Sequence, residues 1–182
     1  MKKPFTLFLA LVGWSVLGDP AQDTPKPATG TDRVGFPEAY AQRFEVLRVV
    51  NKPKEHKIVT VYGNHLAASV TNQSQLPYPY GSVIVMETAK VRDDAEGKPI
   101  LDSQGKIQKA EVSGLHVMRR EFGFGAAYKE HRAGEWEYVE YKPDGSYITP
   151  PVQSASCAEC HVKAGIAQDF VYKGRFGQDS NP

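Results

Sequence analysis

Apolar and polar residues alternate along several short segments of this chain, in the pattern that is typical of β-strands. These segments are Ile58–Tyr62, Ser82–Ala89, Val112–Arg120 and Glu135–Lys142. Residues that favour turns separate them, at Gly97-Lys98-Pro99, at 102–105 and at Pro143-Asp144-Gly145. The pattern therefore predicts an α+β fold that is predominantly an antiparallel β sheet with a few helices.

Two other segments carry a helical period. Pro37 opens the first, which runs through Phe44, and Phe36, Tyr40 and Phe44 recur on one face that we expect to be core. The second extends from about Cys157 toward Ala167, and Ser154 or Ser156 could cap it.

The first residues of the chain predict a secretory signal peptide. Lys2 and Lys3 precede an apolar run from Phe5 to Leu17, and small residues around Gly18 would permit cleavage. The run is shorter than the roughly 20 residues that cross a bilayer as a helix. We therefore expect residues 1–18 to be removed on export, and no integral membrane span in the mature chain.

Composition divides the rest of the chain. Residues 19–34 are rich in Pro, Ala, Thr, Gly and Asp and predict a flexible linker, whereas residues 35–182 suit one domain. The formal net charge is +1, which becomes about −1 without the two lysines of the leader, and no basic stripe is present. Nucleic acid is thus not an expected partner.

The most specific motif is Cys157-Ala158-Glu159-Cys160-His161. Cys-x-x-Cys-His is the spacing by which two thioethers attach a haem, while the histidine binds its iron. The chain has only two Cys, so the motif predicts one haem c per chain, held by Cys157 and Cys160 with His161 on the metal. Covalent haem attachment takes place outside the bacterial cytoplasm, which agrees with export to the periplasm.

Other uses of the same residues remain open. A thioredoxin-like dithiol also uses Cys-x-x-Cys, normally at the start of a helix within a βαβ unit. A structural zinc site would need further Cys or His ligands at regular spacing. A simple disulfide is the third alternative.

The order of several motifs resembles the cytochrome P460 family, which includes the cytochromes c′-beta. The resemblance rests on Pro37 and Tyr40, the strands 57–62 and 81–85, Trp136 with the tyrosines after it, and the late haem motif followed by Asp169-Phe170-Val171. It implies a mostly β, usually homodimeric periplasmic haem protein with His161 as the proximal ligand and an open sixth position. In the P460 enzymes a lysine cross-links to the haem, and the enzyme oxidises hydroxylamine.

This chain departs from that pattern. Met86 stands where the cross-linking lysine is expected, and the family's distal carboxylate and arginine would fall near Gly123-Phe124-Gly125 and Val59. We therefore expect a mostly apolar distal pocket, with Tyr78 and Tyr80 as an aromatic lid, that binds a small neutral ligand such as nitric oxide. The alternatives are a haem oxidoreductase acting on hydroxylamine or a peroxide, and a His/Met electron-transfer cytochrome with Met86 on the iron and a redox partner protein.

Further residues carry weaker expectations. His116 is most simply a solvent-facing or hydrogen-bonded residue, and the three other histidines outside the motif are most simply surface residues. The strand methionine Met118 is most simply a core residue. Four basic residues could hold haem propionates or simply lie on a solvated edge, and four aromatic residues could line the haem pocket or simply pack in the core. The basic residues are Arg119, Arg120, Lys173 and Arg175, and the aromatic residues are Phe122, Phe124, Phe170 and Tyr172. Trp136, Tyr138 and Tyr141 are expected to stabilise the sheet by packing rather than to contact a ligand.

Overall fold

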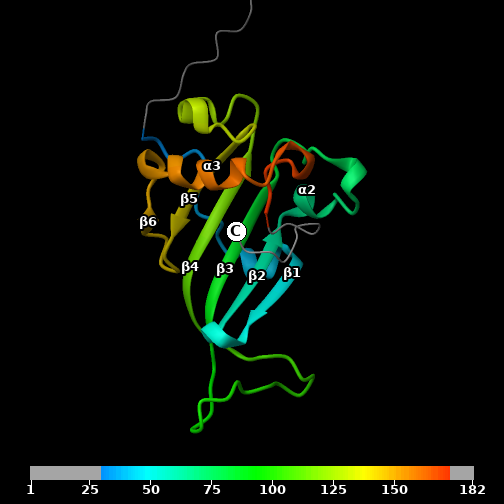
Figure 1. Ribbon diagram of the computed structural model, residues 1–182, viewed down its shortest axis with the longest axis vertical. Coiled ribbons are helices and arrows are strands. Elements are labelled where there is room, and N and C mark those ends of the chain that lie inside the picture. Colours follow the sequence, from blue (N-terminus) through cyan, green and yellow to red (C-terminus); the bar gives the residue numbers. More distant parts are fainter. Residues whose placement is uncertain (1–29, 173–182) are drawn as a thin grey trace, which may run out of the picture.

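The computed structural model describes residues 30–172, which form a single six-stranded antiparallel sheet with short helices around it (Figure 1). The strands neighbour one another in chain order, so every connection is a simple return to the adjacent position. Their bounds are β1 Glu45–Lys52, β2 Lys57–Gly63, β3 Val83–Val91, β4 Lys109–Arg120, β5 Trp136–Tyr141 and β6 Tyr147–Thr149. The fold class expected from the sequence is confirmed.

The four strands expected from the sequence form the centre of this sheet, as β2 to β5. The two edge strands were not expected. In β1 the apolar residues stand in two adjacent pairs, Val46-Leu47 and Val49-Val50, so its sequence lacks the alternation of a half-buried strand. β6 has three residues, too few to show a period.

The helices are short. α1 (Tyr40–Arg43) occupies less of the chain than the expected helix, but Phe36, Tyr40 and Phe44 do pack against the sheet core. α3 (Ala155–Val162) ends before Ala167 because Gly165 adopts a left-handed φ of 78°, after which a separate 3-10 turn begins. The remaining helical segments are α2 (His65–Ala68) and the 3-10 turns η1 (Pro53–Glu55), η2 (Gln73–Gln75), η3 (Ala126–His131), η4 (Pro151–Gln153) and η5 (Ile166–Gln168).

Ser154 stands at the N-cap of α3, as expected, but its side chain does not cap the helix. The hydroxyl is buried, donates to the carbonyl of Pro151 over 2.8 Å and lies 2.9 Å from the hydroxyl of Tyr128. Ser154 therefore ties the start of α3 to the loop before β5.

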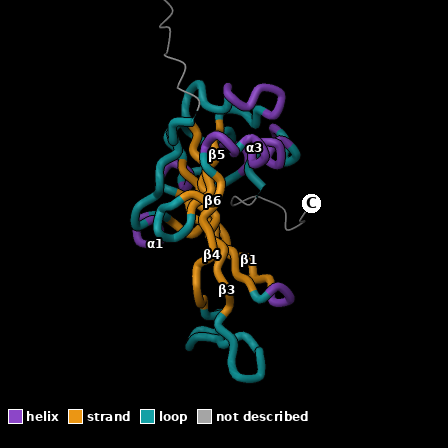
Figure 2. The backbone as a smooth tube through the Cα atoms, turned by 90° about the vertical axis from the view of Figure 1, so that its left-hand side faces the viewer, coloured by secondary structure: helices purple, strands orange, loops and turns teal. Residues whose placement is uncertain are grey.

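The N-terminal segment covers one face of the sheet, and Figure 2 shows α1 on the opposite side of the sheet from α3. The last residues of the expected linker take part in this cover. Asp32 accepts hydrogen bonds from the hydroxyls of Tyr141 (2.6 Å) and Tyr147 (3.1 Å), Arg33 pairs with Glu137, and Val34 is buried. Residues 32–34, which were expected to belong to the linker, thus pack against the sheet. The expected signal peptide and the linker up to residue 29 lie outside the described residues.

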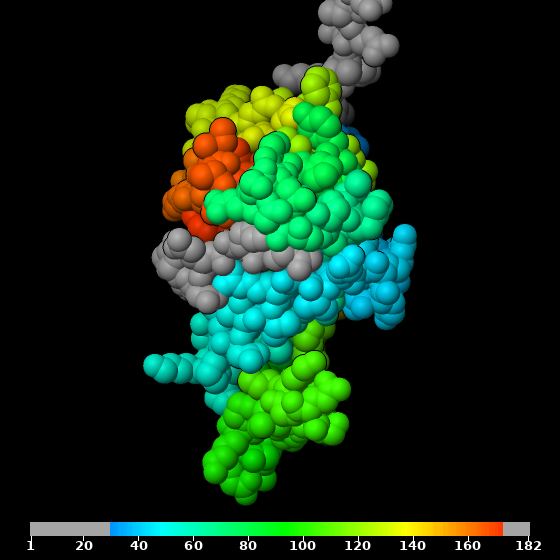
Figure 3. Space-filling view, turned by 90° about the vertical axis from the view of Figure 1, so that its right-hand side faces the viewer, coloured from blue at the N-terminus to red at the C-terminus, as the bar shows by residue number. Residues whose placement is uncertain are grey.

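Between β3 and β4 the chain forms an arm that projects from the end of the sheet (Figures 1 and 3). Both expected turns are present, and they share a repeat, Asp-x-x-Gly-Lys, at residues 94–98 and 102–106. In each copy the Asp carboxylate accepts backbone N–H groups two and four residues ahead. Within residues 30–172 no helix has the length and apolar character needed to cross a membrane.

Candidate functional site

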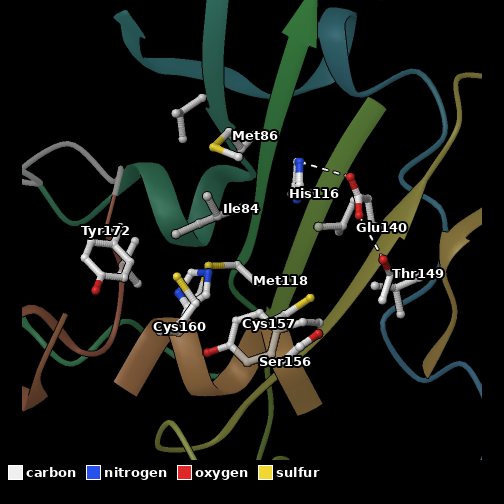
Figure 4. A pocket seen from close by; sticks show the side chains of 16 residues that line it. Ile84, Met86, His116, Met118, Glu140, Thr149, Ser156, Cys157, Cys160 and Tyr172 are labelled. Atoms are coloured by element: carbon white, nitrogen blue, oxygen red, sulfur yellow. Dashed lines mark hydrogen bonds and ion pairs between the residues drawn. The ribbon is translucent and has the colours of Figure 1, made fainter. Parts of the chain in front are cut away.

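A cavity of about 410 Å³ lies between α3 and the face of the sheet that the N-terminal segment leaves uncovered (Figure 4). All three functional residues of the Cys-x-x-Cys-His motif line it, because a spacing of three or four residues places side chains on one side of a helix. Ala158, on the other side of α3, is fully buried and packs the helix against the protein. The cavity is lined by Val61, Ile84, Met86, His116, Val117, Met118, Tyr138, Val139, Glu140, Thr149, Ser156, Cys157, Cys160, His161, Val171 and Tyr172.

His161 is held by contacts on two sides. Its Nδ1 donates a hydrogen bond to the carbonyl of Phe170 over 2.7 Å, and its ring packs on that of Tyr138 with centroids 4.5 Å apart. A carbonyl can only accept, so the proton is on Nδ1 and Nε2 keeps its lone pair. Burial lowers the pKa of His161 to about 4 although the Phe170 carbonyl acts in the opposite direction. The imidazole is therefore neutral at physiological pH, which is the form that binds a metal.

The two cysteines are both thiols, and neither forms a disulfide. Cys157 is half-buried, and burial raises the pKa of its thiol, whereas Cys160 is exposed. The sheet is antiparallel throughout, so the motif does not sit in the βαβ unit of a thioredoxin-like dithiol. Among residues 30–172 no three His, Cys, Asp or Glu side chains gather closely enough to hold a metal ion, as a zinc site would require.

The sheet supplies the opposite wall of the cavity through two rows of side chains that run across the strands. One row pairs Ile84 with Met118 and then Tyr138. The other pairs Val61 with Met86, Met86 with His116, His116 with Glu140, and Glu140 with Thr149. The wall is apolar at the β2 and β3 end and polar toward β6.

The polar end of this wall is a connected chain. Nε2 of His116 lies 3.1 Å from Oε1 of Glu140, and Oε2 of Glu140 accepts a hydrogen bond from Thr149 over 2.9 Å (Figure 4). His116 was expected to be an ordinary surface or hydrogen-bonded histidine, and Glu140 and Thr149 were not singled out at all. The alternation within β4, which puts His116 on the same face as Met118, was the available signal.

Three of the expected site residues lie elsewhere. Tyr78 is buried against Trp136 rather than over the cavity, with ring centroids 5.8 Å apart. The ring of Phe124 lies under the guanidinium of Arg33 at 4.2 Å and does not line the cavity. Phe170 contributes its carbonyl to His161, while its ring lies against Gly134.

Of the other residues singled out from the sequence, some line the cavity and some do not. Met86 and Tyr172 line the cavity, and Tyr172 approaches His161 edge to face at 5.8 Å. Trp136 and Tyr141 are buried in the core, whereas Tyr138 lines the cavity. Arg119 and Arg120 do not line it, Tyr80 and Phe122 are exposed, and Lys173 and Arg175 lie outside the described residues.

The donor set fits a covalently attached haem. Two free thiols one helical turn apart can form the two thioethers, the adjacent imidazole presents an unprotonated Nε2, and an apolar wall faces them across the cavity. Helix, cavity and sheet together define a c-type haem protein built on an antiparallel sheet.

Comparison with known families gives the same class. The family model for cytochrome P460 matches residues 37–173, which is most of the chain. The chain belongs to the cytochrome P460 family, whose members bind haem c. No curated protein sequence matches the chain.

Proposed function

We propose that this chain is an exported, periplasmic haem protein that binds a small neutral molecule such as nitric oxide on the open side of its haem. One haem is attached through Cys157 and Cys160, with His161 as the proximal ligand of the iron. When bound, the haem supplies an iron with a coordination position for the small molecule. A second copy of the chain is the partner that the family resemblance implies, and a redox protein is the partner that the electron-transfer alternative would require.

The observation that carries the proposal is the apolar wall opposite His161. Val61, Ile84, Met86 and Met118 face the motif across the cavity, and none of them can compensate the charge of an anionic ligand. A neutral diatomic molecule loses little on leaving water, whereas a charged ligand loses its hydration. Met86 also replaces the amine that the P460 enzymes use for their cross-link, so the two thioethers are the expected attachments.

The electronic spectrum of the mature protein tests this proposal directly. We expect a high-spin ferrous haem that takes up NO and CO, with a polypeptide mass increased by one haem. A ferrous spectrum that is low-spin without added ligand would instead favour a His/Met electron carrier with Met86 on the iron. Sequencing the N-terminus of protein recovered from the periplasm tests cleavage after Gly18.

A second candidate function is oxidation of hydroxylamine, and the His116–Glu140 pair is the observation in its favour. Oxidation of hydroxylamine requires a group that removes protons, and an imidazole paired with a carboxylate is suited to that task. Both side chains line the cavity, and 45% of the His116 side chain is exposed, so a proton taken from a bound molecule could pass on to solvent. Turnover of hydroxylamine with an added electron acceptor would distinguish this function from simple binding.

A further inference from the structure

The carbonyl that contacts His161 is held by a turn of unusual backbone conformation. Asp169 and Phe170, which follow η5, have φ values of 46° and 60°. Residues other than glycine rarely adopt these left-handed angles, and two in succession persist only where surrounding contacts offset the strain. This conformation places the Phe170 carbonyl against Nδ1 of His161.

The side chain of Asp169 makes the contacts that hold the turn. Only 7% of it is exposed, and Oδ2 accepts a hydrogen bond from the backbone N–H of Tyr78 over 2.9 Å. The same oxygen lies 3.6 Å from Nε of Arg120. Asp169 therefore fastens the turn after α3 to the segment that leads into β3.

Arg120 connects these segments to a third. Its Nη1 donates to the carbonyl of Tyr78, its Nη2 lies 3.6 Å from Glu135, and its guanidinium stacks on the ring of Tyr80 at 4.6 Å. Because Arg120 ends β4, the whole arrangement is anchored on the sheet. The guanidinium is the counter-charge for a carboxylate that is otherwise enclosed.

Two further contacts immobilise the same turn. The ring of Phe170 lies so close to Gly134 that a Cβ there would be 2.9 Å from Cδ2 of the ring. Nε2 of Gln73 donates to the carbonyl of Ala167 over 3.2 Å. The turn is thus fixed from both sides, although Asp169 provides its only ionic contact among those the structure describes.

The carboxyl group of Asp169 is enclosed by the protein. Burial raises the pKa of Asp169, and the Tyr78 N–H and Arg120, which act in the opposite direction, offset only part of the loss of hydration. The side chain does not line the cavity and cannot touch a ligand there. Asp169 can therefore affect the site only through the Phe170 carbonyl, which accepts the hydrogen bond from Nδ1 of His161.

We propose that Asp169, held by Arg120, is a positioning residue that sets the electron donation of His161 to the haem iron. It fixes the turn in which the Phe170 carbonyl accepts the Nδ1 proton, and an acceptor behind a metal-bound histidine raises the basicity of the ligating nitrogen. A more basic ligand stabilises ferric iron and lowers the reduction potential. The inference rests on the proposed ligation of iron by His161.

The test uses the haem-loaded Asp169→Asn variant. Asn can still accept the Tyr78 N–H but cannot pair with Arg120, so the turn loosens and the Nδ1 hydrogen bond lengthens. We expect the iron–histidine stretching band of the ferrous protein, measured by resonance Raman spectroscopy, to move to lower frequency, and the reduction potential to rise. Asp169→Glu, which restores the charge, should recover part of both shifts.

Glu87→Gln is the matched control, because Glu87 is a buried carboxylate on the opposite face of the sheet. It should lower thermal stability while leaving the Raman band and the potential unchanged. If Asp169→Asn, like the control, lowers thermal stability but leaves the Raman band and the reduction potential unchanged, the positioning role is excluded. If Asp169→Asn does not accumulate with haem, Arg120→Gln replaces it in the test. We expect the same two shifts, and a change in thermal stability alone would again exclude the positioning role.

The experiment also separates this inference from the proposed function. A wild-type ferrous protein without an iron–histidine band would contradict the open sixth position of the haem, and with it the proposed function. The comparison of reduction potentials between wild type, Asp169→Asn and Glu87→Gln would still decide whether Asp169 acts on the haem.

Discussion

Met86 and His116 stand directly opposite each other on β3 and β4, and both side chains line the cavity that faces the haem-attachment motif. The pair marks a boundary on the cavity wall. Apolar side chains continue from Met86 toward β2, and the hydrogen-bonded chain of Glu140 and Thr149 continues from His116 toward β6. The apolar side favours the binding of a small neutral molecule, and the polar side favours the oxidation of hydroxylamine.

Replacing Met86 by leucine tests whether the thioether binds iron. Leucine keeps a similar volume and removes only the sulfur, so the apolar wall is retained. We expect the ferrous spectrum to stay high-spin and the affinity for NO to change less than about threefold, since packing of similar volume is preserved. A change from low-spin in the wild type to high-spin in the variant would show that Met86 is a ligand.

Removing the motif residues one at a time should separate haem attachment from iron ligation. Cys157→Ala or Cys160→Ala should each leave one thioether, which the pyridine haemochrome spectrum distinguishes from two. His161→Ala should keep the mass of the attached haem but lose the iron–histidine band, and added imidazole should restore a histidine-like spectrum. A colourless His161→Ala protein with an unmodified mass would contradict this division of roles.

Replacing Glu140 by glutamine distinguishes proton removal from ligand binding. The amide keeps the shape of the chain between His116 and Thr149 but cannot take up a proton. Loss of a general base costs typically 10²–10⁴-fold in rate. We therefore expect hydroxylamine oxidation, if the wild type performs it, to fall by roughly 10²-fold while NO affinity stays close to that of the wild type. Ser156→Ala, which alters another cavity residue, is the control.

The sequence predicted the parts of this site that depend on local spacing. Cys157, Cys160 and His161 share one side of a helix because of their separation along the chain, and the alternating strands reveal themselves by their period. Met86 was found because the resemblance aligned it with a functional lysine. These features need no knowledge of which strand lies beside which.

The polar wall could not be predicted in that way. His116, Glu140 and Thr149 lie on three strands, and they meet only because the register of β4, β5 and β6 places them in one row. A shift of one residue would turn any of them to the other face of the sheet. The aromatic residues Tyr78 and Phe124 illustrate the same limit, since composition suggested a lid where tertiary packing placed them in the core and under Arg33.

The buried ion pair on the opposite face offers a test of stability. Glu87, with 5% of its side chain exposed, lies 2.5 Å from Nζ of Lys109 and accepts a hydrogen bond from Tyr40. Breaking a buried pair typically costs about 3–5 kcal/mol, and the partial exposure of Lys109 places this one at the low end. We expect Glu87→Ala to lower the free energy of unfolding by about 3 kcal/mol in denaturant titrations, because Lys109 loses its counter-charge. A loss below about 1 kcal/mol would mean that the pair behaves as an exposed one.

Alkaline pH should destabilise the protein through its enclosed tyrosines. Burial raises the pKa of Tyr40, Tyr138 and Tyr141 above the ordinary value of 10.0, and the carboxylates of Glu87 and Asp32 reinforce the effect at Tyr40 and Tyr141. The pKa of Lys109 is also raised, since its hydrogen bonds to Glu87 and Tyr62 outweigh its burial. These groups keep their protons longer in the folded than in the unfolded chain.

The sign of the pH dependence follows from that difference. Below pH 10 both states are protonated at these tyrosines and their contribution to stability is complete, whereas above it the unfolded state alone ionises and the free energy of unfolding falls. Denaturant titrations from pH 8 to pH 11 should show this fall, and tyrosinate absorbance should rise in step with unfolding. Tyr141→Phe should make the dependence shallower. If the three tyrosines ionise in the folded protein near pH 10, their hydroxyls are not enclosed as the structure shows, and the hydrogen bonds of Tyr40 to Glu87 and of Tyr141 to Asp32 are not formed.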